Sequence, residues 1–149
     1  MKMTPELQMA QENMLPGKIS GQGFLGDDHR PLIDIITEDE ERLAKSGKSF
    51  DELFQRMEYF MIHGRKGLGE PIVVDNEWEV WVDEARGKMV CPFQDGIFAK
   101  INAHVCKTLT KDCITYSELA LHLIHKHHFF QGNPSSYRLN PEELVRILF

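Results

Sequence analysis

The chain has 149 residues and a mass of 17.2 kDa, and its 17 basic and 23 acidic side chains give a formal charge of −6. Apolar residues make up 42% and charged residues 27%, a globular balance that excludes collagen-like and wholly disordered chains. We therefore expect a single domain over residues 1–149. Because phosphate binding requires a net basic surface, the acidic charge predicts that nucleic acid is not a partner.

The sequence also bears on compartment and membrane contact. No apolar run approaches the roughly 18 residues that span a bilayer, so we expect no membrane partner. Residues 1–6 lack the charged-then-apolar layout of a secretory signal, and three cysteines are an odd number for a disulfide framework. These features predict a cytoplasmic protein with free cysteines. The alternative is a processed secreted form.

The first 30 residues predict a weakly helical, glycine-rich arm. Thr4 and Pro5 fit the N-cap and first position of a short helix over residues 4–14. A glycine-rich segment follows, and it contains three large apolar residues, Ile19, Phe24 and Leu25. A free linker has little use for such side chains, so we expect this segment to lie against the body of the protein.

Two amphipathic helices are predicted next. Asp28 and Pro31 mark the start of the first, and Gly47 marks its end. We interpret its acidic run, residues 38–41, as a solvated face. Its apolar residues recur at helical spacing: Leu32, Ile35, Ile36 and Leu43.

A capping box at residues 49–52 opens the second of these helices, over residues 50–63, which we expect to pack through Phe54, Met57 and Met61. We expect Gly64 to cap this helix and residues 65–69 to form a basic turn. A phosphate-binding loop would instead run from a strand into a helix N-terminus.

From Ile72 the apolar period changes to two. Residues 72–74 and 78–82, around a turn at Asp75 and Asn76, predict a hairpin. Residues 88–90, 101–106 and 113–114 are further candidate strands. In the strand 101–106, Ile101, Ala103 and Val105 face one way, and Asn102, His104 and Cys106 face the other.

Two helices are predicted after the strands. A capping box at residues 115–118 opens a helix from about Tyr116 to His127, and Asn140 and Pro141 open a last helix that packs through Leu144, Ile147 and Leu148. Short strand connections predict an antiparallel arrangement. The expected fold class is α+β, with a small sheet of about four or five strands, two or three N-terminal helices and two C-terminal helices.

Several segments resemble a family of small bacterial cytosolic proteins that carries no assigned activity, cofactor or partner. The similar blocks are residues 23–28, 67–71, 84–92 and 129–139, and the resemblance extends over most of the chain from about Pro16. It implies a soluble bacterial protein and transfers no functional residue.

Histidines are concentrated in residues 122–128, where four of the seven lie. Helical spacing places His127 on the apolar face, with His122 and His125 together on the opposite face. We interpret the latter two as a solvated pair, since the helix supplies no acidic third ligand for a metal. His127 is expected to be buried, with a lowered pKa unless a carboxylate lies beside it.

The cysteines suggest a second group, Cys91, His104, Cys106 and Cys113. A hairpin through Thr110 would bring Cys113 beside Cys106, on the face that carries His104. Zinc accepts such ligands, but no paired Cys-x-x-Cys knuckle is present, so we favour free cysteines. Nucleophilic catalysis by Cys91 is a further alternative.

The loop at residues 129–138 is polar apart from the adjacent Phe129 and Phe130. We expect that the two rings are not both buried and that one lines a groove, with Arg138 available for a carboxylate or phosphate. The alternative is a loop folded over its own aromatic rings. Our candidate ligand-binding residues are His127, Phe130, Tyr137 and Arg138.

The sequence favours a binding or regulatory module that acts on an unidentified protein or small molecule, with no assigned cofactor or metal ligand. No nucleophile elbow, phosphate loop or dinucleotide fingerprint is present. The alternative is a metalloprotein or enzyme that uses His127 or the group Cys91, His104, Cys106 and Cys113.

Overall fold

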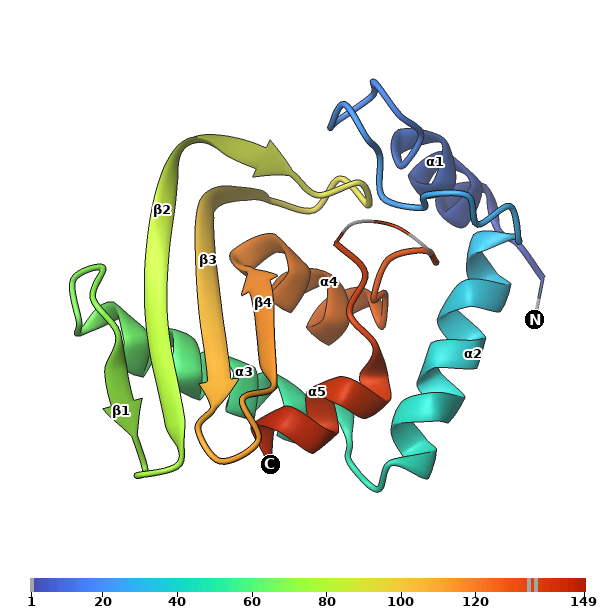
Figure 1. The fold of residues 1–149 in the computed structure, drawn as a ribbon. Coiled ribbons are helices and arrows are strands. Elements are labelled where there is room, and N and C mark those ends of the chain that lie inside the picture. Colours follow the sequence, from blue (N-terminus) through green and yellow to red (C-terminus); the bar gives the residue numbers. More distant parts are fainter. Residues whose placement is uncertain (1, 134, 136) are drawn as a thin grey trace.

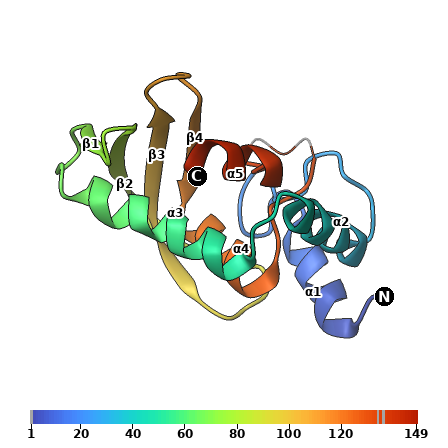
Figure 2. The same cartoon turned by 90° about the horizontal axis from the view of Figure 1, so that it is seen from below.

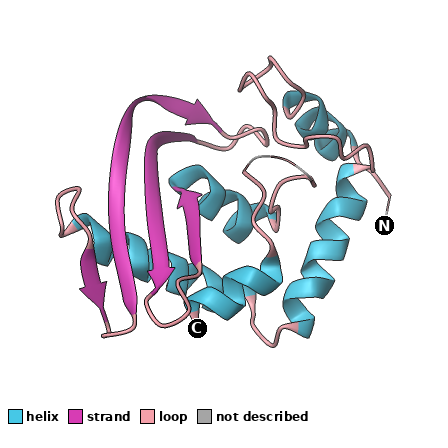
Figure 3. Ribbon diagram, viewed as in Figure 1, coloured by secondary structure: helices cyan, strands magenta, loops and turns pink. Residues whose placement is uncertain are grey.

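The computed structural model describes residues 2–133, 135 and 137–149 (Figure 1). Three helices precede a four-stranded sheet and two follow it, which confirms the α+β class (Figure 3). No helix among the described residues is both long enough and apolar enough to cross a membrane. The helices are α1 Pro5–Asn13, α2 Leu32–Lys45, α3 Phe50–Arg65, α4 Glu118–His127 and α5 Pro141–Leu148, and the strands are β1 Ile72–Val74, β2 Trp78–Val90, β3 Ile97–Lys107 and β4 Cys113–Ser117.

The sheet is antiparallel throughout, with the strands in the order β1-β2-β3-β4. The predicted hairpin is confirmed: its turn places Asp75 and Asn76 at positive φ, which suits the twist of the strands that it joins. Residues 88–90, expected to be a separate strand, are instead the end of β2. The pairing of β2 with β3 shifts register between Ala85 and Lys88 and then continues.

One face of the sheet carries the larger apolar core. As predicted, Ile101, Ala103 and Val105 are buried on the same face of β3. Helices α3 and α4 pack against β2 and β3, and α3 crosses the strands in the view from below (Figure 2). The alternation of inward apolar and outward polar residues therefore determines which face the helices cover.

Helix α3 begins at the predicted capping box, with Ser49 and Glu52 each accepting a backbone hydrogen bond from the other. Its predicted end is wrong, because the helix continues through Gly64 to Arg65. Gly64 is required by packing: a Cβ there would lie 2.7 Å from Val80 Cγ1 and 2.8 Å from Val82 Cγ2. The glycine allows α3 to approach β2 closely.

Helix α4 also begins later than predicted. Thr115 and Tyr116 belong to β4, and Ser117 is the N-cap, whose hydroxyl accepts a hydrogen bond from the Ala120 backbone N at 3.0 Å. Both Thr115 and Ser117 are suitable caps by type, and pairing with β3 keeps Thr115 extended. The predicted cap of α5 is confirmed, since Asn140 accepts from Glu143 N at 3.1 Å.

The N-terminal arm lies against the body, as expected. Thr4 caps α1, and Phe24 and Leu25 are buried. They belong to a second apolar cluster, formed by the arm, α2, α4 and the end of β2. Its buried members are Ala10, Met14, Phe24, Leu25, Leu32, Ile35, Ile36, Cys91, Leu119, Leu123 and Phe129.

Asp28 does not cap α2, because Pro31 occupies the N-cap position without a side-chain hydrogen bond. The Asp28 carboxylate instead accepts from the Arg30 guanidinium at 2.7 and 2.9 Å and from Asn133 N at 3.2 Å. It therefore joins the arm to the loop after α4. The hydrogen bond with Arg30 lowers the pKa of Asp28 from 3.8 to about 2.

We expect Asp28→Asn to destabilise the protein in a pH-dependent way. A carboxyl group whose pKa is lowered on folding contributes stability above its unfolded pKa and loses this contribution as the pH falls through its folded pKa. The free energy of unfolding of the variant should lie about 2 kcal/mol below that of the parent at pH 7. Urea titrations should show this difference shrinking from pH 4 to pH 2, and a difference independent of pH would contradict the assignment.

The acidic run on α2 is a solvated face only in part: Glu38 and Glu41 are exposed, but Asp39 and Glu40 are not. Asp39 is 2% exposed, and both of its carboxylate oxygens accept from the Arg138 guanidinium, at 2.7 and 2.8 Å. Glu40 pairs with His128 Nδ1 at 2.6 Å. The interpretation fails at Asp39 and Glu40 because their partners lie 99 and 88 residues away in the chain, where helical spacing cannot locate them.

The adjacent Phe129 and Phe130 are both buried, at 1% exposure each, so the expectation that one of them lines a groove is wrong. His128 ends α4 in the left-handed conformation, with φ at 54°, and this reverses the chain direction. As a result Phe129 enters the second cluster, whereas Phe130 enters the larger core.

Candidate metal centre

The turn between β2 and β3 places a thiol and a carboxylate close together. Cys91 follows the last residue of β2, and its backbone N donates to Gly96 O at 3.0 Å. Gln94 adopts a positive φ of 63°, which tightens the turn around Asp95. Asn13 Nδ2 donates to the Pro92 carbonyl at 3.0 Å and so attaches the turn to α1.

Two imidazoles from α4 reach the same carboxylate. His122 Nε2 lies 2.9 Å from Asp95 Oδ1, and His127 Nε2 lies 2.7 Å from Asp95 Oδ2. Each ring is supported by an aromatic neighbour: Phe93 stacks on His127 with 3.9 Å between centroids, and Phe98 lies 4.4 Å from His122. The nitrogen atoms that face Asp95 are therefore held in position before any ligand binds.

The four side chains bring their ligand atoms together. Cys91 Sγ, a carboxylate oxygen of Asp95 and one nitrogen each of His122 and His127 all lie within 4.8 Å of one another. One sulfur, two imidazole nitrogens and one oxygen form a donor set that zinc accepts in a tetrahedral arrangement. This group is the candidate metal centre.

Charge and burial at this centre favour the protonated thiol. Burial, and then the neighbouring Asp95, raise the pKa of Cys91 to about 12. Burial also raises the pKa of Asp95, but hydrogen bonds from Cys91 and the two imidazoles outweigh it, and the net shift is downward. Cys91 is therefore a poor nucleophile in this state. A bound cation would favour the thiolate by replacing its proton.

His127 meets the expectation of burial only in part. Its side chain is 19% exposed, and burial lowers its pKa although the adjacent Asp95 acts in the opposite direction. The lowered pKa agrees with the sequence-based expectation. That expectation made an exception for a neighbouring carboxylate; Asp95 is such a neighbour, but burial has the larger effect on the pKa of His127.

The interpretation of His122 and His125 as a solvated pair is wrong. His122 is less exposed than His127, at 14% for its side chain, and it faces Asp95. His125 instead stacks on Phe54 of α3, with 3.8 Å between centroids. Helix α4 is covered both by α3 and by the turn between β2 and β3, so the helix has no single polar face.

The structure does not bring the four candidate ligand-binding residues together. His127 lies beside Asp95, and Phe130 is buried in the larger core. Arg138 is occupied by Asp39 and by the Gln131 carbonyl, to which it donates at 2.8 Å. Tyr137 is 64% exposed and borders a separate cavity.

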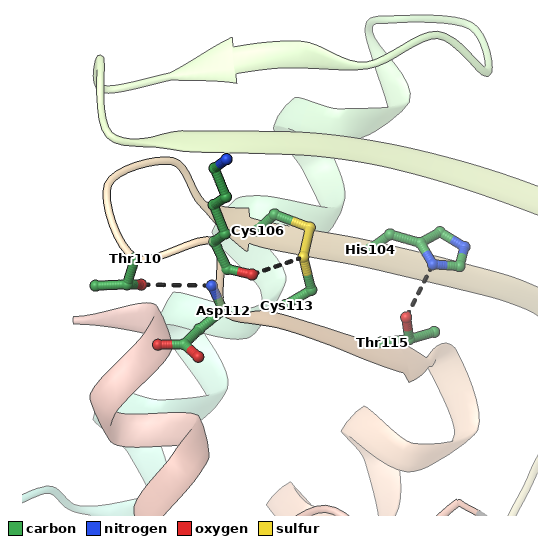
Figure 4. Close-up of a disulfide and its surroundings, with 7 residues drawn as sticks. His104, Cys106, Thr110, Asp112, Cys113 and Thr115 are labelled. Carbon is green, nitrogen blue, oxygen red and sulfur yellow. Dashed lines mark hydrogen bonds between the residues drawn. A yellow bond between two sulfur atoms is a disulfide. The ribbon is translucent and has the colours of Figure 1, made fainter.

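The alternative group of Cys91, His104, Cys106 and Cys113 is divided. Cys106 and Cys113 are paired in the register of β3 and β4, with 4.0 Å between Cα atoms, and form a disulfide (Figure 4). The predicted proximity is confirmed, but the expectation of three free cysteines is wrong. Cys91 is the free cysteine. It follows Val90, which pairs with Ile97, and the nine steps along the strand from Ile97 to Cys106 span about 30 Å.

His104 has other partners on the face of the sheet opposite the larger apolar core. Its Nδ1 lies 2.9 Å from Thr115 Oγ1, as Figure 4 shows, and its Nε2 lies 2.6 Å from Asp83 Oδ2. Trp81 stacks on the ring at 5.0 Å between centroids. These are cross-strand contacts between neighbouring positions of the sheet.

Sequence reasoning found Cys91 and His127 separately but missed Asp95 and the role of His122. The available signal was a cysteine and an aspartate four residues apart in a short connection between strands. The pairing of β2 with β3 makes this connection a tight turn, and α4 then packs beside it. The chain matches no protein-family model, and neither the curated proteins nor the solved structures show a significant similarity to it.

Proposed function

We propose that this protein binds a divalent transition metal ion, zinc, through Cys91, Asp95, His122 and His127. The observation that carries the proposal is the convergence of these four ligand atoms within 4.8 Å. The proposal develops the metalloprotein hypothesis drawn from the sequence. It keeps Cys91 and His127 and replaces the other residues.

The proposed role of the metal is structural. Four protein ligands fill a tetrahedral zinc site, whereas catalytic zinc usually keeps one position for water or substrate. The ligands come from the turn at residues 91–96 and from both halves of α4, so zinc would join the end of the hairpin to the helix. This role agrees with a binding module better than with a catalyst.

Several features support zinc over a harder cation. Mg²⁺ and Ca²⁺ prefer oxygen ligands, and this set supplies a single carboxylate. Cys91 is buried in the second apolar cluster, where a thiolate bound to zinc is neutralised by the metal. The Phe93 and Phe98 rings limit the rotation of the imidazoles, so few conformations are lost on binding.

Metal analysis of the full-length protein, purified without a histidine tag, tests the proposal. We expect one zinc per chain, and we expect Co²⁺ to give the near-ultraviolet charge-transfer absorption of a thiolate ligand. Zinc at a thousandfold excess over its dissociation constant should raise the free energy of unfolding by about 4 kcal/mol. Cys91→Ser should remove the charge-transfer absorption, and His127→Gln should weaken zinc binding by at least about tenfold.

His125→Gln is the matched control. His125 lies on the same helix but pairs with Asp51 rather than Asp95, so this variant should bind zinc like the parent. The proposal fails if the parent holds no stoichiometric zinc, or if His125→Gln and His127→Gln weaken binding equally.

A further inference from the structure

A second site is indicated by a cavity of about 350 Å³ that contains none of the proposed metal ligands. Its lining residues come from β2, β3, β4 and the first turn of α4. Figure 1 shows how these elements are arranged. The N-terminal arm and the loop after α4 complete its wall. Its volume is at the lower end of the range of about 300–1,000 Å³ for small-molecule sites.

The cavity combines apolar walls with a single charge. Phe24, Leu119 and Leu139 supply apolar surface. Lys100 is the one charged residue of the lining among the described residues, and it forms no ion pair within them. The chain as a whole has a charge of −6, so a cavity with one cation and no carboxylate in its described lining favours an anionic ligand.

Gln131 provides an independent observation. The residue lines the cavity and is 6% exposed. The side-chain oxygen accepts from Ser135 Oγ at 3.3 Å, whereas the side-chain NH₂ has no hydrogen-bond partner in the part of the chain that the structure describes. No side-chain nitrogen or oxygen of the described residues is both fully buried and without a partner, so this NH₂ is accessible and can donate to a ligand in the cavity.

The backbone at Gln131 holds this amide in place. Its φ of 73° lies in the left-handed region that residues other than glycine rarely adopt. The conformation is fixed by the hydrogen bond from Arg138 to the Gln131 carbonyl, at 2.8 Å, and Arg138 is itself held by Asp39. Strained residues of this kind are enriched at ligand sites.

We propose that this cavity binds a small amphipathic carboxylate. Its alkyl part would lie against Phe24, Leu119 and Leu139, and its carboxylate would accept from the Gln131 amide beside the charge of Lys100. A carboxylate can accept from the accessible Gln131 NH₂, and it supplies a negative charge for Lys100, which has no ion-pair partner among the described residues. Tyr137 borders the same cavity, so one residue of the sequence-based ligand set takes part.

Octanoate is the probe for this proposal, compared with octanol and octylamine, which share its chain length. Titration of each compound into the ¹⁵N-labelled full-length protein would be followed by NMR. We expect saturable shifts for octanoate at the amides of Leu119, Ala120 and Gln131, and at least tenfold weaker binding of the alcohol and the amine.

Two variants separate specific binding from apolar partitioning. Lys100→Met removes the charge and keeps the length of the side chain, so octanoate binding should weaken by about tenfold or more. Gln131→Asn shortens the side chain and so moves the amide away from the ligand, whereas asparagine still tolerates the positive φ. This variant should also weaken octanoate binding. Lys126→Met is the control, because Lys126 lies on the exposed surface of α4 outside the cavity lining.

The proposal is overturned if octanoate gives no saturable shifts at these amides. It is equally overturned if octanol binds as tightly as octanoate, or if Lys100→Met and Lys126→Met bind octanoate alike.

Discussion

Replacement of Arg138 by alanine should lower the free energy of unfolding by about 3–5 kcal/mol, because it leaves a buried carboxylate without its counterion. The Asp39 side chain is 3% exposed and that of Arg138 is 10% exposed. Arg42 lies 3.7 Å from Asp39, beyond hydrogen-bond distance, and does not replace the bidentate contact. Urea denaturation at neutral pH measures the loss.

Two variants test this explanation. Arg146→Ala breaks the exposed contact with Asp112 and should cost about 0–1 kcal/mol. In the double variant Asp39→Leu with Arg138→Met, both charges are removed and apolar volume is retained, so most of the lost stability should return. If Arg138→Ala costs no more than Arg146→Ala, the pair is not desolvated as the structure shows.

Phe60→Ala should also lower the free energy of unfolding by about 3–5 kcal/mol, because it opens a cavity in the larger core. Phe60 is fully buried, and its ring lies 5.1 Å from that of Trp78, between centroids. The whole stability of a domain is typically about 5–15 kcal/mol, so we expect a large fall in the urea midpoint.

Phe54→Ala is the comparison on the same helix. The sequence places Phe54 in the buried stripe of α3, but the structure shows it half-buried and stacked on His125 at 3.8 Å. Its truncation should therefore cost clearly less than that of Phe60. Equal or reversed effects would show that the helix packs through a different face from the one in the structure.

Local signals predicted much of the fold. The caps at Ser49 and Asn140 and the turn at Asp75 depend on neighbours within a few residues, and each is found where the sequence indicates. Periodicity likewise identified the buried face of β3. Such features are visible in sequence because the interacting groups are close in the chain.

Contacts between distant residues account for the errors. Gly64 fits the pattern of a helix cap, but the structure requires a glycine there because α3 packs closely against β2. Asp39 fits the pattern of a solvated face, but in the structure it pairs with Arg138, 99 residues away in the chain. The strand pattern placed Cys106 beside Cys113, but the odd total of three cysteines in the chain favoured free thiols over the disulfide.

The candidate metal centre was predicted least well. Cys91 and His127 are 36 residues apart, and nothing in their spacing shows that Asp95 lies between them. The helical projection of α4 placed His122 with His125, since it assumed one buried face. The turn at residues 91–96 packs against a second face of α4, and this packing brings His122, rather than His125, to Asp95 together with His127.

The burial of Phe129 and Phe130 in different clusters has a mechanical consequence. Successive Cα atoms are about 3.8 Å apart, so neither cluster can open far without pulling on the side chain anchored in the other. The left-handed His128 places this junction at the end of α4, between the arm with α2 on one side and the sheet on the other. The arm and the sheet should therefore exchange their protected amide hydrogens as one cooperative unit rather than as two.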